Sequence, residues 1–175
     1  IYTLMIWLEI IIISVLFFCV YNYQNNWTPN YPSFSSEEEL IKIGHRGAPS
    51  LAHENTLLSF TKAIETGMKG VELDIQLSAD GQMVVFHDWN LANLTGSEKK
   101  IEEMPYSEIR QLQDPKSNEK VYLPLFGDVL EILPLNCLII IELKSTHVKN
   151  TGIEKNVLDI IKNKNIEKNC IISSF

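Results

Sequence analysis

Apolar and polar residues are unevenly distributed along the 175-residue chain, and its first segment differs from the rest. Residues 4–20 are almost wholly apolar, and Glu9 is their one charged side chain. A continuous apolar stretch of this length is typical of a short membrane-spanning helix or a long signal-peptide core. A carboxyl near the bilayer centre costs about 3 kcal/mol on insertion scales, so Glu9 weakens the membrane assignment without removing it.

The residues that follow the apolar segment indicate how it is used. No small-residue cleavage site follows it, which favours an uncleaved anchor over a cleaved signal. We therefore expect a transmembrane or signal-anchor helix over residues 1–20 and a linker rich in Asn, Tyr, Pro and Ser over residues 21–39. Residues 21–41 contain no Lys or Arg, and because cytoplasmic flanks are enriched in both, we expect an extracytoplasmic domain. Cleavage of the segment would instead give a secreted protein.

Beyond residue 40, short apolar runs that favour strands alternate with amphipathic segments that favour helices. We predict strands over residues 41–43, 71–77, 83–86, 138–143 and 170–175. We predict helices over residues 107–112, 125–133 and 153–161, and a further one that Asn55 caps and Gly67 ends. This alternation predicts an α/β domain with a mainly parallel sheet.

Two features of this domain leave alternatives open. The link between the strands at 71–77 and 83–86 contains the hairpin signal Asp80-Gly81 and is too short for a helical crossover, so this pair is either locally antiparallel or joined by an extended loop. A doubly wound sheet and a (β/α)8 barrel both fit the strand pattern. A complete barrel needs about 250 residues, so a barrel would imply that roughly its last three strands are absent.

Titratable side chains gather at the ends of the predicted strands, where α/β enzymes keep their active sites. Because alternate residues of a strand share a face, each of four strands directs such groups to one face. They are His45 on the first strand, Glu72 and Asp74 on the second, His87 on the third, and Glu142 and Lys144 on the fourth.

The residue types in this set indicate metal-dependent chemistry. Three carboxylates without Cys suit Mg²⁺ or Ca²⁺ rather than zinc. Two histidines on different strands can act as general acid and base, while Arg46 and Lys144 can hold a phosphate. Singly, a histidine at a strand end is more often structural, and a lone Glu is more often solvated or paired with a lysine. Three acids buried together would repel one another unless a cation lay among them. The interpretation as a metal site therefore rests on the three acids together rather than on any one of them.

Net charge and cysteine spacing argue against other classes of function. The net charge is −7 and no Lys/Arg-rich run occurs, so we expect no nucleic-acid surface. Three widely spaced cysteines form neither a disulfide framework nor a zinc site. His53 and His147 lack the strand-end pattern and are interpreted as surface residues. Glu54 is a candidate to hold a residue of the site in place without binding the ligand itself.

Taken together and in this order, the motifs resemble those of the glycerophosphodiester phosphodiesterase family. The resemblance covers residues 41–175. It rests on His45-Arg46-Gly47-Ala48, Glu54-Asn55-Thr56, Glu72-Leu73-Asp74, His87-Asp88 and Glu142-Leu143-Lys144. The sequence departs from the family pattern at His53, where Pro is usual, at Asn93, where Arg is common, and at Leu125 and Gly127.

The resemblance implies that residues 40–175 form a phospholipase-C-like (β/α)8 barrel, which we expect to be truncated after about five strands. It implies Glu72, Asp74 and Glu142 as ligands of Ca²⁺ or Mg²⁺, His45 and His87 as the acid/base pair, and Arg46 and Lys144 as phosphate contacts. The expected reaction converts a glycerophosphodiester to glycerol 3-phosphate and an alcohol. The alternatives are lysophospholipase-D or phospholipase-C-like action on a lipid phosphodiester, and a truncated remnant without activity. No protein partner is predicted.

Overall fold

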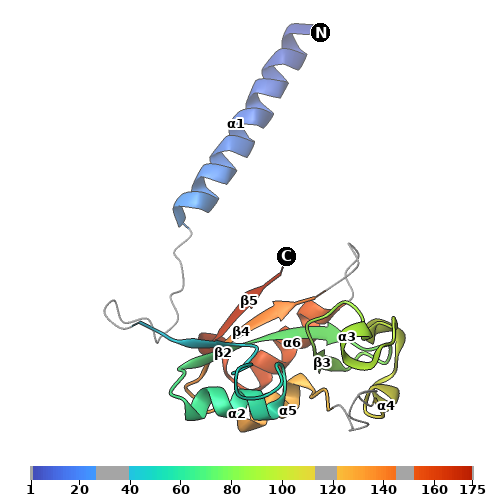
Figure 1. The fold of residues 1–175 in the computed structure, drawn as a ribbon. Coiled ribbons are helices and arrows are strands. Elements are labelled where there is room, and N and C mark those ends of the chain that lie inside the picture. Colours follow the sequence, from blue (N-terminus) through green and yellow to red (C-terminus); the bar gives the residue numbers. More distant parts are fainter. Residues whose placement is uncertain (1, 27–39, 113–121, 145–151, 175) are drawn as a thin grey trace. The chain divides into compact units, whose positions relative to one another are not determined.

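The computed structural model describes residues 2–26, 40–112, 122–144 and 152–174 (Figure 1). They belong to two units, Ile1–Tyr31 and Pro32–Phe175. The first unit contains α1 (Tyr2–Asn26), and the stretch Met5–Tyr23 within it is long and apolar enough to cross a membrane, a property that a signal sequence shares. The first unit therefore contains an apolar N-terminal helix, as the residue pattern predicts.

The second unit is organised around a five-stranded sheet. The strands are β1 (Ile43–His45), β2 (Gly70–Leu77), β3 (Met83–Val85), β4 (Leu138–Leu143) and β5 (Cys170–Ser173). Parallel pairing joins the strands in the order β1-β2-β4-β5, and β3 pairs with β2 alone. The prediction of a mainly parallel α/β sheet is confirmed. The parallel strands follow chain order in space, without the reversal that characterises a doubly wound sheet.

The link between β2 and β3 is a hairpin. The two strands are antiparallel, with Ile75 opposite Val85 and Leu77 opposite Met83. Gly81 has a φ of 76°, a conformation that the turn requires and that glycine adopts without strain. The short link thus returns the chain alongside β2 and carries residues 86–88 back toward the middle of that strand.

The longer helices cover one face of the sheet (Figure 1). They are α2 (Leu57–Glu65), α5 (Phe126–Ile132) and α6 (Ile153–Asn163). The shorter helices are α3 (Ala92–Thr95), α4 (Tyr106–Ile109), η1 (Ile101–Glu103) and η2 (Glu167–Asn169), of which α3, α4 and η1 pack with Val84 of β3 in a second core cluster. The main core packs side chains of the longer helices against alternate residues of β2 and β4: Phe60, Phe126, Val157, Leu73, Ile75, Ile139 and Ile141. Because side chains alternate along a strand, Glu72, Asp74 and Glu142 lie on the opposite face.

Two local expectations are corrected. Thr56, rather than Asn55, caps α2: its backbone is extended and its hydroxyl accepts a hydrogen bond from the backbone N–H of Ser59 at 3.2 Å. Asn55 instead has a φ of 55°, in the left-handed region, and its side chain does not cap the helix. The first strand begins at Ile43, two residues later than expected, because pairing with β2 starts where Ile43 faces Gly70.

Candidate active site

The turn that follows β1 folds His45 and Arg46 back toward β2. The Gly47 backbone N–H donates to the Gly44 carbonyl at 3.1 Å, and Gly47 has a φ of 90°. A side chain at Gly47 would place its Cβ 2.4 Å from the Ser59 hydroxyl, so glycine is required for this close approach to α2. The turn presents the Arg46 backbone N–H to the Glu72 carboxylate, which accepts it at 3.0 Å.

Strand β2 places two carboxylates on the face away from the helices. Asp74 is completely buried, and Glu72 lies half-buried two residues before it. Burial raises the pKa of Glu72, and the neighbouring charge of Asp74 raises it further. Both effects oppose ionisation, so positive charge nearby would stabilise the ionised form of this pair.

Strand β4 adds the third carboxylate and a lysine. In the parallel register Glu142 lies opposite Asp74. The Lys144 ammonium lies 2.6 Å from Glu142 Oε1 and 3.2 Å from Asp74 Oδ1. It also lies 5.8 Å from the ring centroid of Trp89, within the range of a cation–π contact. The lysine therefore occupies one side of the acidic cluster.

Glu72, Asp74 and Glu142 meet the geometric condition for a shared cation. One carboxylate oxygen from each lies within 4.8 Å of the others. Asp74 Oδ1 is buried and accepts no hydrogen bond from the described residues, although Lys144 is within ion-pair distance of it. The Lys144 ammonium offsets part of the cost of burying this oxygen, and a cation bound beside it would offset more. The donor set consists of hard oxygen atoms and fits Ca²⁺ or Mg²⁺.

A count of charges supports the same fit. Four carboxylates gather here: Glu54, Glu72, Asp74 and Glu142. Two permanent cations contact them, namely Arg46 and Lys144. With all four acids ionised and the histidines neutral, the cluster carries two surplus negative charges, which one divalent cation balances.

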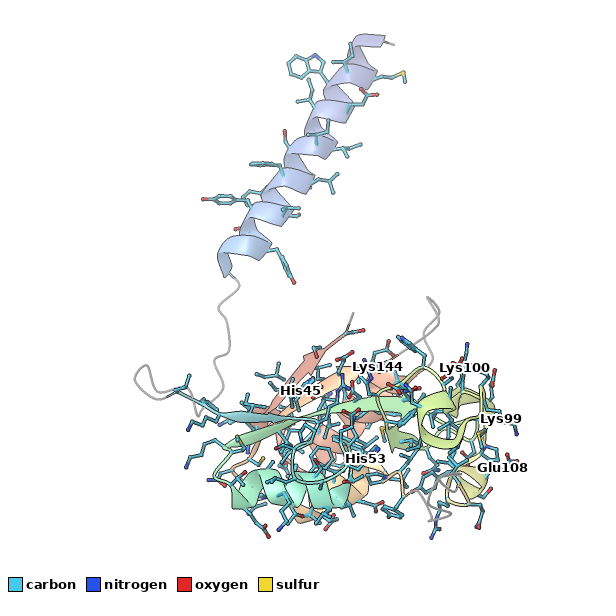
Figure 2. The ribbon with its side chains drawn as sticks, in the orientation of Figure 1. His45, His53, Lys99, Lys100, Glu108 and Lys144 are labelled. Carbon is cyan, nitrogen blue, oxygen red and sulfur yellow. The ribbon has the colours of Figure 1, made fainter. Side chains whose placement is uncertain are left out.

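The two predicted catalytic histidines lie at different elements. His45 Nε2 lies 3.8 Å from Glu72 Oε2, and the imidazole is largely exposed on the same side of the sheet as Lys144 (Figure 2). His87 follows β3, and its Nδ1 lies 2.8 Å from Asp88 Oδ1. The Phe86 backbone N–H donates to the Asp74 carbonyl at 3.1 Å, so the segment carrying His87 lies beside β2 at the level of Asp74.

His87 follows the C-terminal end of β3, and of the two alternatives for the link before β3 the structure has the antiparallel one. Strand β3 ends at Val85, and the hairpin return carries residues 86–88 back toward the middle of β2. The Gln76 side-chain amide then holds the segment by donating to the Phe86 and Asp88 carbonyls at 2.9 and 2.8 Å.

Asn55 was missed as a site residue, because Asn before an apolar run is typical of a helix cap. Its amide nitrogen donates to Asp74 Oδ2 at 2.9 Å, and its side chain is buried. Its amide oxygen is buried without a hydrogen-bond partner in the described part of the chain. Glu54 behaves as expected of a supporting residue, since its Oε1 accepts from the Arg46 guanidinium at 3.0 Å.

Asp88 is the second partner that sequence reasoning did not single out. Burial alone would raise its pKa, but hydrogen bonds from His87 and Asn93 outweigh burial and hold the pKa below its ordinary value. Asp88 is therefore ionised at neutral pH and fixes the Nδ1 side of the His87 ring. His53 is exposed, as expected, while His147 lies outside the described residues.

Comparison with known proteins adds a family assignment to this geometry. A glycerophosphodiester phosphodiesterase from Caldanaerobacter subterraneus is 38% identical over 140 residues, which make up 77% of this chain and 58% of that protein. A crystal structure of a glycerophosphodiester phosphodiesterase from Thermotoga maritima matches with a TM-score of 0.64 and 37% identity, over 79% of this chain and 55% of that one.

A third relative was solved with a reaction product. It is a phosphodiesterase from Oleispira antarctica in complex with sn-glycerol-3-phosphate, and it matches with a TM-score of 0.68 and 28% identity over 78% of this chain and 57% of that one. The chain thus spans somewhat more than half of the length of these relatives. The model of the glycerophosphoryl diester phosphodiesterase family matches residues 45–174, and the chain belongs to that family.

Proposed function

We propose that the protein hydrolyses glycerophosphodiesters to glycerol 3-phosphate and an alcohol with the help of Ca²⁺ or Mg²⁺. The observation that carries the proposal is the cluster of Glu72, Asp74 and Glu142, whose oxygens lie within 4.8 Å of one another and include a buried, unsatisfied atom of Asp74. Family membership and a relative solved with sn-glycerol-3-phosphate support the choice of substrate.

In this proposal Glu72, Asp74 and Glu142 hold the cation. When bound, it would polarise the phosphoryl oxygens and lower the pKa of the attacking hydroxyl or water. Asn55 fixes one oxygen of Asp74 through its hydrogen bond and leaves Oδ1 available as a ligand. The Arg46 backbone N–H fixes one oxygen of Glu72 in the same way.

Arg46 and Lys144 are proposed to hold the phosphate, the first as a planar fork and the second as a point charge. Both already lie against the carboxylates: Arg46 Nε is 3.5 Å from Asp74 Oδ2, and Lys144 contacts Asp74 and Glu142. Arg46 Nε is buried without a hydrogen-bond acceptor among the described residues.

His45 and His87 are proposed to move the protons. One removes a proton from the attacking group, and the other protonates the leaving alcohol. Because Asp88 occupies Nδ1 of His87, Nε2 is the nitrogen of that ring that can exchange a proton with the substrate. His45 lies 3.8 Å from Glu72 and is accessible to solvent, so its ring can reach a ligand on the open side of the cluster.

The test is release of glycerol 3-phosphate from glycerophosphocholine with Ca²⁺ or Mg²⁺ present. The variants His45→Ala and His87→Ala are each expected to lower kcat by about 10²–10⁴, the usual contribution of a general acid or base. Far-ultraviolet circular dichroism of both variants checks that the fold is retained. Activity that survives both substitutions would show that the acid/base assignment is wrong.

A lipid-derived substrate is the second candidate, and the apolar helix α1 favours it. We propose that Met5–Tyr23 anchors the protein to a membrane with residues 40–175 on the extracytoplasmic side. A lysophospholipase-D or phospholipase-C-like activity would act on phosphodiesters in that membrane. Turnover of lysophosphatidylcholine and glycerophosphocholine by the full chain in vesicles would rank the two candidates.

We also propose that residues 40–175 belong to a (β/α)8 barrel. The parallel strands β1, β2, β4 and β5 adjoin one another in chain order, and the longer helices cover one face, as in such a barrel. Asp74 and Glu142 lie in the C-terminal halves of β2 and β4, and barrel enzymes keep their sites at this end of the strands.

A further inference from the structure

Strand β2 carries a third polar side chain on the face that holds two of the proposed cation ligands. Gln76 follows Glu72 by four residues and Asp74 by two, so alternation along the strand directs all three side chains to one side of the sheet. Gln76 is 7% exposed, and a buried amide needs hydrogen-bond partners inside the protein. Its partners lie in the segment that carries His87.

The amide nitrogen of Gln76 has two N–H groups to donate, and that segment offers two acceptors. Nε2 donates to the Phe86 carbonyl at 2.9 Å and to the Asp88 carbonyl at 2.8 Å. These carbonyls belong to the residues immediately before and after His87. One side chain therefore holds the backbone on both sides of the proposed acid/base.

The backbone adds one further hydrogen bond to this attachment. Strand β3 ends at Val85, and beyond it the Phe86 N–H donates to the Asp74 carbonyl at 3.1 Å. In the described part of the chain, residues 86–88 thus make three hydrogen bonds to β2, and Gln76 makes two of them. Without the Gln76 amide the segment would keep the one bond placed before His87 and lose its attachment on the far side of the imidazole.

We propose that Gln76 is a positioning residue, which fixes the His87 imidazole relative to the cation that Glu72 and Asp74 would hold. The inference rests on the proposed function and adds the residue that links its two parts, the metal site and the acid/base. The link is short because Gln76 and Asp74 belong to the same strand. A misplacement of about 1 Å can lower a reaction rate about 10²-fold, so this attachment affects turnover although it is made to backbone carbonyls.

The same attachment ends at the residue before Trp89. The Trp89 ring centroid lies 5.8 Å from the Lys144 ammonium, which two carboxylates hold at 2.6 and 3.2 Å. The carboxylates hold Lys144 more closely than the ring does, so release of Trp89 is expected to leave the proposed phosphate contact in place. Loss of the Gln76 amide should therefore lower kcat and leave KM unchanged.

Nuclear magnetic resonance of the unaltered full chain in detergent micelles tests the attachment directly. The side-chain amide protons of Gln76 are expected to exchange with water more slowly than those of Gln82, because Gln82 is exposed. The neutral His87 ring is expected to carry its proton on Nδ1, which lies 2.8 Å from Asp88 Oδ1. Side-chain protons of Gln76 that exchange as fast as those of Gln82 would overturn the proposal.

The matched variants are Gln76→Met and Gln82→Met. The first removes both donors and keeps the length of the side chain, and the second makes the same change at an exposed position between β2 and β3. For Gln76→Met we expect kcat for glycerophosphocholine to fall by about 10²-fold, with unchanged KM and unchanged affinity for Ca²⁺ or Mg²⁺. We also expect the His87 ring to lose its preference for Nδ1–H. Gln82→Met should match the unaltered chain in all four measurements.

The outcomes separate this proposal from the proposed function. If the unaltered chain hydrolyses no glycerophosphodiester while Gln76→Met moves the His87 proton from Nδ1, the attachment of His87 by Gln76 stands and the proposed function is contradicted. If the unaltered chain hydrolyses glycerophosphocholine and Gln76→Met does so with the same kcat, the function stands and the positioning role is overturned. A loss of cation affinity as large as the loss of kcat would show a general disturbance of β2 and would also overturn the positioning role.

Discussion

The two ends of strand β4 have different surroundings, and the difference shows what identifies a site in this fold. Near its C-terminal end lie Glu142, Lys144 and the acidic cluster. Near its N-terminal end lies a hollow of about 450 Å³, larger than the pocket of about 330 Å³ that Glu54 and Asp88 line. Apolar side chains dominate the larger hollow: Leu130, Leu133, Pro134, Leu135, Cys137, Ile139 and Ile166.

Charge separates the two ends more clearly than volume does. At the N-terminal end Glu131 pairs with Lys164, whose hydrogen bond lowers the pKa of the carboxyl. At the C-terminal end burial and the charge of Asp74 raise the pKa of Glu72. One end is balanced pair by pair, and the other carries surplus negative charge with a buried oxygen of Asp74 unsatisfied. The C-terminal end of β4, with its surplus negative charge, is therefore the end suited to a cationic ligand.

The largest expected effect comes from neutralising the centre of the unbalanced end. Asp74→Asn removes a proposed cation ligand while keeping the side-chain shape. We expect kcat for glycerophosphodiester hydrolysis to fall by about 10²–10³, the usual result of losing one preorganised electrostatic group. The measurement is steady-state release of glycerol 3-phosphate. If Asp74→Asn retained full activity, the acidic cluster would not be the metal site.

The second effect concerns the turn that builds this end. Gly47→Ala forces a side chain into a left-handed conformation and against Ser59, so we expect the free energy of unfolding to fall by about 1–3 kcal/mol. Gly127→Ala is the matched control, because the same change in α5 meets open space and improves helix propensity by up to about 1 kcal/mol. Urea denaturation measures both. Equal shifts of the two variants would contradict the requirement for glycine at 47.

The third effect is a pH dependence that Glu72 creates. Its pKa is above the ordinary 4.5 in the folded chain, so between the two values the folded state binds more protons than the unfolded state. The unfolding free energy contributed by Glu72 therefore falls as pH rises through that window. Glu72→Gln removes this loss and keeps an acceptor for the Arg46 N–H.

We therefore expect the Tm of Glu72→Gln minus that of the unaltered chain to increase from pH 4.5 toward neutral pH when both are metal-free. Thermal unfolding followed by circular dichroism at a series of pH values gives this difference. A difference that stays constant, or that decreases with pH, would show that Glu72 is not destabilised by its surroundings.

The smallest effect is expected at the balanced end. Glu131→Gln removes an exposed ion pair with Lys164, and exposed pairs contribute little to stability. We expect neither the Tm nor the rate of phosphodiester hydrolysis to change measurably. A loss of activity in Glu131→Gln would show that the larger hollow takes part in function and would remove the distinction between the two ends.

The sequence predicted those parts of the fold that depend on local periodicity. Strand β4 has the predicted bounds because an uninterrupted β-favouring run has no competing local structure. Glu72 and Asp74 share a face as expected, since alternation along a strand does not depend on the rest of the fold. Their convergence with Glu142 followed from the general placement of polar groups at the ends of parallel strands.

The parts that depend on distant contacts were not predictable in this way. Asn55 has the local pattern of a cap, and its hydrogen bond to Asp74 joins residues 19 positions apart. Asp80-Gly81 allowed either a hairpin or an extended loop, and pairing between β2 and β3 decides between them. That pairing also brings the segment that carries His87 beside β2 at the level of Asp74, which no periodicity of residues 83–87 reveals.

The most direct test of the central claim is a calorimetric titration of the metal-free full chain with Ca²⁺ and with Mg²⁺. We expect saturable binding of one divalent ion per chain by at least one of them, and loss of that binding in Asp74→Asn. Absence of saturable binding of either ion, or binding that Asp74→Asn leaves unchanged, would contradict the claim that Glu72, Asp74 and Glu142 form a metal site.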